Sequence, residues 1–144
     1  MTFDPRRPTS LKEVSVLAKS GGRFDPVLRE FLDEFYGFDR GRRIAALADE
    51  PDWLSAIHDA YLAAVAEHLS LSYGLDVPAW TQSPRRTLER PFFAGGMEGL
   101  KALLLVESPL AFRRRNIFVS HDALDRPRML RKADPDAGSF VFTI

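Results

Sequence analysis

Arginine is the residue type whose number and spacing most suggest a binding chemistry in this chain of 144 residues. Three consecutive arginines separate two apolar runs in the stretch SPLAFRRRNIFVS, residues 108–120, and two more stand together in a proline-rich segment before it. Guanidinium groups bind carboxylates and phosphates through paired hydrogen bonds, so gathered arginines favour an anionic partner. The candidate partner- or anion-binding residues are Arg85, Arg86, Arg113, Arg114 and Arg115.

The three consecutive arginines cannot all serve one surface if they lie on a helix. Successive helical residues point about 100° apart, so at most two of the three share a face. We expect Arg114, or Arg113 and Arg114 together, to face solvent, while Arg115 or its neighbour packs its aliphatic stem against the core. If carboxylates of this chain paired with all three, the arginines would be internal scaffolding and not a binding site.

Residues that carry out catalysis or bind metals do not form a recognisable pattern. The chain has no cysteine, and His58 and His68 are ten residues apart, too far for the one-turn spacing with which a helix holds a metal. We interpret His68 as a core residue. The acidic residues cluster on the polar sides and at the ends of predicted helices, and no serine lies in a nucleophile motif. We therefore predict a non-enzymatic protein without metal or cofactor.

The composition predicts one soluble globular domain over residues 1–144, with 45% hydrophobic and 28% charged residues. The absence of cysteine and of any apolar run long enough to span a membrane predicts a cytoplasmic protein without membrane contact. The formal net charge is zero, but the chain carries nine Lys/Arg against thirteen Asp/Glu up to residue 80 and eleven against seven after it. The carboxyl-terminal half is therefore expected to attract an acidic partner.

Apolar residues recur at helical spacing over most of the chain, which predicts a mainly α bundle of about six helices. Thr9 or Ser10 is expected to cap the first helix, Asp25 the second and Asp52 the long fourth, which ends at Gly74. A flexible lead-in at residues 1–8 and an ordered proline-rich connector at 76–96 complete the domain. The helical segments are 9–22, 24–39, 39–51, 51–74, 97–109 and 109–116.

Two short segments near the carboxyl terminus predict at most a minor two-stranded β element. The terminal SFVFTI, residues 139–144, alternates large apolar residues with a period of two and is expected to pair with IFV at 117–119. In the alternative, the terminal segment is an edge offered to a second copy, which would make a homodimer.

Several longer phrases resemble an uncharacterised family of small bacterial proteins and the carboxyl-terminal region of some helix-turn-helix regulators. These phrases are VLREFLDEFY, DAYLAAVAEHL, LDVPAWTQSPRRTLERPFFAGG and LKALLLVESPLAFRRRNIFVSHDAL, which together cover about residues 26–124. Proteins of this kind are often encoded beside nucleotidyltransferase-like toxins. The resemblance implies an antitoxin-like or toxin-regulating role.

The leading interpretation is a protein-interaction module that acts as the antitoxin-like partner of a nucleotidyltransferase-type toxin. Only about two dozen residues precede the part that resembles the regulators, so we expect protein contact rather than operator binding by this chain alone. The first alternative is a nucleic-acid-binding regulator that uses the arginine-rich carboxyl-terminal half. The second is a small enzyme on an anionic substrate, since Gly95-Gly96 precede a helix start whose N–H groups could bind an anion.

Overall fold

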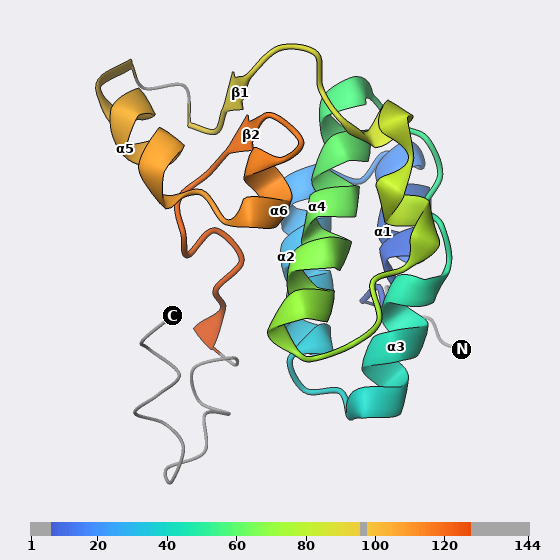
Figure 1. The fold of residues 1–144 in the computed structure, drawn as a ribbon. Helices are drawn as coiled ribbons and strands as arrows, with labels where there is room; N and C mark the ends of the chain where they lie inside the picture. The colour runs from blue at the N-terminus through green and yellow to red at the C-terminus, as the bar shows by residue number, and fades with distance from the viewer. Residues whose placement is uncertain (1–6, 96–97, 128–144) are drawn as a thin grey trace, which may run out of the picture.

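A mainly α fold with a small two-stranded sheet is observed, as predicted (Figure 1). The structure is a computed structural model, and it describes residues 7–95 and 98–127. The six α-helices within these ranges are α1 (Leu11–Lys19), α2 (Phe24–Phe35), α3 (Arg40–Ala48), α4 (Ala56–Ser72), α5 (Lys101–Glu107) and α6 (Leu110–Arg113). The short elements are the 3-10 turns η1 (Ala79–Gln82), η2 (Pro84–Arg86) and η3 (Glu98–Leu100), and the strands β1 (Phe92–Phe93) and β2 (Ile117–Phe118).

Helix α4 is the centre of the fold, with α2 on one side and the connector on another (Figure 1). Most residues between Asp59 and Ser70 are buried, on every side of the helix, and several are alanines that let neighbouring elements approach closely. Ser55, whose Oγ accepts from the N–H of His58 at 3.3 Å, caps the helix. The predicted cap, Asp52, is wrong, because this carboxylate pairs with lysines of α1. The predicted end is confirmed, with Gly74 at a φ of 68°.

The first three helices share one hydrophobic core with α4. Ser10 caps α1 as expected, accepting from the N–H of Glu13 at 3.1 Å. Helix α2 begins at Phe24, one residue before the expected cap, so Asp25 lies in its first turn. The reason is that Arg23 has the extended backbone of an N-cap residue and Phe24 is drawn into the core. The buried face of α2 consists of Phe24, Leu28, Phe31, Leu32 and Phe35.

Aromatic side chains pin residues 76–95 of the connector to the rest of the fold. The Trp80 indole N–H donates to the carbonyl of Leu47 at 3.0 Å, and the ring of Phe93 stacks on that of Phe118 with centroids 5.0 Å apart. The connector also contains β1, which sequence reasoning did not identify as a strand.

Strand β2 is confirmed, but its partner in the structure is β1. The two strands run parallel, with Phe92 opposite Ile117. Asn116, at a left-handed φ of 65°, turns the chain out of α6 and donates from Nδ2 to the carbonyl of Leu88, which brings the connector alongside. The expected partner, residues 139–144, lies outside the described residues. None of the helices in the described ranges is long and apolar enough to cross a membrane.

The close packing of α4 predicts that its buried alanines do not tolerate larger side chains. Ala64 is fully buried, so Ala64→Leu should lower the free energy of unfolding by about 1–3 kcal/mol through overpacking. Ala56, exposed at the start of the same helix, is the matched control, and Ala56→Leu should change it by less than about 0.5 kcal/mol. Urea denaturation of the two variants would measure the difference. Equal effects would contradict the central position of α4.

Candidate functional site

The structure divides the five candidate arginines into a buried pair and an exposed set. Arg86 is 0% exposed and Arg115 2%, whereas Arg85, Arg113 and Arg114 lie at the surface. The expected orientation of the consecutive arginines is therefore confirmed, with Arg113 and Arg114 toward solvent and Arg115 packed inside. The two buried guanidinium groups have no surface to offer a partner.

Arg115 shares one buried carboxylate with Arg114. Glu67, on α4 and 5% exposed, accepts from Arg115 Nη1 on Oε1 at 2.6 Å and from Arg114 Nη1 on Oε2 at 2.5 Å. Arg115 also donates to the carbonyls of Ala111 and Thr81, at 2.8 and 2.7 Å. Burial lowers the pKa of Arg115, and its hydrogen bond with Glu67 acts in the opposite direction. This side chain therefore joins α4, α6 and η1.

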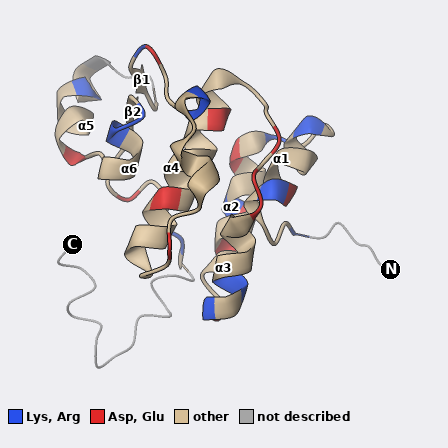
Figure 2. Ribbon diagram, turned by 45° about the vertical axis from the view of Figure 1, so that its right-hand side comes forward, with Lys and Arg blue, Asp and Glu red and all other residues tan. Residues whose placement is uncertain are grey.

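Glu67 was not among the residues that sequence reasoning selected, although a signal for it existed. It is the one acidic residue in the apolar stretch AYLAAVAEHL. This part of α4 is buried on every side, so a carboxylate here cannot be solvated by water. Figure 2 shows acidic positions in the central α4 and basic positions beside β2 and α6. A lone charge in such a helix indicates a buried ion pair, but the sequence does not say with which arginine.

Arg86 joins the connector to the start of α4. Its Nη2 donates to the carbonyl of Pro51 at 2.9 Å and to Glu50 Oε2 at 3.1 Å, and its Nη1 donates to the carbonyl of Asp59 at 3.1 Å. Its guanidinium carbon lies 4.2 Å from the centroid of the Trp53 ring. These contacts make Arg86 a structural clamp in the described part of the chain.

Helix α5 carries an exposed apolar face. The helix stands apart from the bundle and contacts β2 (Figure 1). Only Leu104 of its aliphatic side chains is buried. Val106 is 76% exposed and Leu110, the first residue of α6, 60%. Leu103 and Leu105 of α5 are also exposed, as is Leu100 just before the helix.

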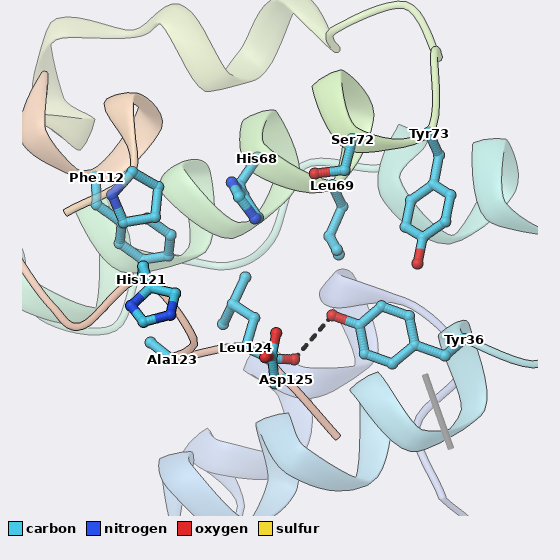
Figure 3. Close-up of a pocket in the computed structure, with 11 residues that line it drawn as sticks. Tyr36, His68, Leu69, Ser72, Tyr73, Phe112, His121, Ala123, Leu124 and Asp125 are labelled. Carbon is cyan, nitrogen blue, oxygen red and sulfur yellow. Dashed lines mark hydrogen bonds between the residues drawn. The ribbon is translucent and has the colours of Figure 1, made fainter. Parts of the chain in front are cut away.

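A small pocket lies between α2, α4 and the turn at 121–125 (Figure 3). The Tyr36 hydroxyl donates to the carbonyl of Leu124 at 2.8 Å, and burial raises the pKa of Tyr36. His68 lines the pocket from α4, and burial lowers its pKa. With a volume of about 60 Å³ the pocket has room for a few waters but not for an organic substrate.

A larger groove of about 340 Å³ runs beside α2, mostly between apolar side chains. No group of three or more histidine or carboxylate side chains in residues 7–95 and 98–127 could hold a metal ion. Gly95 has a φ of 87°, and Gly96 lies outside the described residues, so the expected anion site at Gly95-Gly96 is not described.

The chain matches no known family model, no curated protein and no solved structure.

The Glu67 cluster predicts a strong dependence of stability on one carboxylate. Glu67→Gln leaves the guanidinium of Arg115 buried without a countercharge, so unfolding should become easier by about 3–5 kcal/mol. The matched control is Glu34→Gln, because this carboxylate pairs with Arg7, whose side chain is 49% exposed, so no buried charge loses its partner. Its cost should be below about 1 kcal/mol. Thermal and urea denaturation measure both, and a reversed order would contradict the central role of Glu67.

Two histidines predict opposite pH effects on stability. Burial lowers the pKa of His68, so its contribution is complete above the ordinary value of 6.5 and falls as pH drops below it. The hydrogen bond to Glu107 raises the pKa of His121, so its contribution is complete below 6.5 and is lost as pH rises through the folded value. Titration of the imidazole Cε1 protons by NMR should place the His68 midpoint below 6.5 and the His121 midpoint above it. Coincident midpoints would refute the prediction.

Proposed function

We propose that this chain is a cytoplasmic, non-enzymatic protein-interaction module and the antitoxin-like partner of a nucleotidyltransferase-type toxin. The observation that carries the interaction role is the exposed apolar face of α5. Contiguous exposed aliphatic surface on a single chain is typical of a surface that a partner covers. The kind of partner comes from the family resemblance of about residues 26–124.

The geometry of α5 favours a protein as the partner that binds its exposed face. Residues 102, 103, 105 and 106 fall on one side of the helix at about 100° per residue, and all are apolar. The opposite side carries Leu104, which packs inward, while Ser108 Oγ donates to the Leu104 carbonyl and accepts from the N–H of Val119. The helix is therefore held in place with its apolar side outward. A convex apolar face of this kind fits an apolar groove on the partner.

The surface charges beside α5 favour a partner with carboxylates around its groove. Arg113 and Arg114 are exposed immediately after this apolar face. An apolar centre with a polar rim is the usual arrangement of a protein interface. The combination supports a protein partner over a small-molecule substrate.

A nucleic-acid-binding regulator is the second candidate, favoured by the exposure of Arg85, Arg113 and Arg114. Binding of this kind should weaken steeply with added salt, because each neutralised phosphate releases counterions. Absence of a gel shift with duplex DNA at low ionic strength would remove this candidate.

The test of the proposed function is co-expression with the product of the adjacent gene, followed by size-exclusion chromatography. The two proteins should elute together, and the double variant Leu103→Asp with Val106→Asp should separate them, because two desolvated carboxylates oppose burial of α5. Ile44→Asp is the matched control, since Ile44 is 47% exposed on α3, away from this face. That control should leave the complex intact.

Independent elution at micromolar concentrations would contradict the proposal. A dimer of this chain alone that the double variant abolishes would assign the α5 face to a second copy instead. Loss of the complex in the Ile44→Asp control as well would show that the effect is not specific to α5.

A further inference from the structure

The three consecutive arginines at α6 carry more positive charge than the described carboxylates around them neutralise. Glu67 is the only acidic side chain that forms ion pairs with Arg114 and Arg115 among the described residues. The side chain of Arg113 forms no ion pair in that part of the chain. Three guanidinium groups and one carboxylate, 3 − 1, give this cluster a net charge of +2.

The negative charge of Glu67 is needed to neutralise the buried guanidinium of Arg115. Arg115 is 2% exposed, and a buried guanidinium needs its countercharge, whereas the side chain of Arg114 is 43% exposed and reaches water. The second contact of Arg114 is with Gln82 Oε1 at 3.1 Å, which is neutral. The charge of Arg114 also lowers the pKa of Arg115, so the two cations repel each other. An anion from outside would relieve this repulsion.

The exposed arginines adjoin the apolar surface. On the turn of α6, residues at i, i+3 and i+4 share a face, which places Arg113 and Arg114 beside Leu110. Leu110 is 60% exposed and follows the α5 face in the chain. Apolar and cationic surface thus meet at α6.

We infer that Arg113 and Arg114 bind carboxylates of an acidic segment on the protein that covers α5. The identity of that protein rests on the proposed function, but the anion site does not. A carboxylate-bearing protein segment fits better than nucleic acid, because nucleic-acid interfaces are strongly positive and polar, and here aliphatic side chains lie beside the arginines. The guanidinium fork of Arg113 provides bidentate geometry for a carboxylate. Arg114, whose Nη1 and Nη2 already donate to Glu67 and Gln82, adds positive charge beside it.

The experiment uses the full chain and a fluorescein-labelled octaglutamate peptide, with binding followed by fluorescence anisotropy at low ionic strength. Because the toxin is absent, failure here and failure of the proposed function are distinguishable. The peptide should bind and should shift the Nε–Hε resonances of Arg113 and Arg114 in NMR spectra. Arg113→Gln should weaken binding at least about threefold, as expected for loss of one exposed ion pair.

Arg113→Gln is the decisive variant, because Arg114→Gln would also remove the ion pair with Glu67 and change stability as well as binding. Arg85→Gln is the control, since Arg85 is exposed but contacts Trp53, with its guanidinium carbon 3.9 Å from the ring centroid. It should leave the affinity unchanged. Unchanged binding in Arg113→Gln, or an equal loss in Arg85→Gln, would overturn the inference. Tighter, Arg113-dependent binding of a short duplex DNA would also overturn it and favour the nucleic-acid candidate.

Discussion

The buried carboxylate of Glu67 holds the buried guanidinium of Arg115 at 2.6 Å, and the position of the carboxyl-terminal part of the described chain follows from this pair. Glu67 belongs to the central helix, and Arg115 lies two residues after the end of α6. Arg115 also donates to the carbonyl of Thr81 in the connector. Because a buried ion pair is costly when either partner is lost, these three segments keep one arrangement. The same arrangement turns Arg113 and Arg114 outward.

Arg86 holds the connector against the start of α4, just as Arg115 holds α6 against the middle of α4. The proline-rich segment cannot pair its backbone in a regular helix or sheet, so neighbouring backbone carbonyls need other donors. A guanidinium group offers five N–H donors on one rigid plane and can bind several carbonyls at once. Arg86 uses this capacity on the carbonyls of Pro51 and Asp59, against the ring of Trp53. The two buried arginines thus stabilise the irregular half of the fold.

Apolar side chains are usually buried and charged ones exposed, but around α5 and α6 aliphatic side chains are exposed and an arginine is buried. Two arginines are buried within the domain while Val106 and Leu110 are more than half exposed. Burying apolar surface is the main driving force of folding and association. A partner that covered these exposed side chains would therefore gain binding free energy from burying them. This is the physical basis for proposing an interaction module rather than an enzyme.

Local patterns in the sequence were sufficient for the helices, because the spacing of apolar residues and the caps act within a few residues of each other. Ser10, Gly74 and the outward direction of Arg113 and Arg114 were predicted on this basis. Asp52 was wrongly assigned as a cap because lysines of α1, distant in the sequence, compete for its carboxylate. The pairing of β2 with β1, the burial of Arg86 and the role of Glu67 depend on contacts between residues 25 to 48 positions apart. Periodicity reports which face of a helix is apolar, but the partner of a buried charge is set by packing, which brings distant residues together.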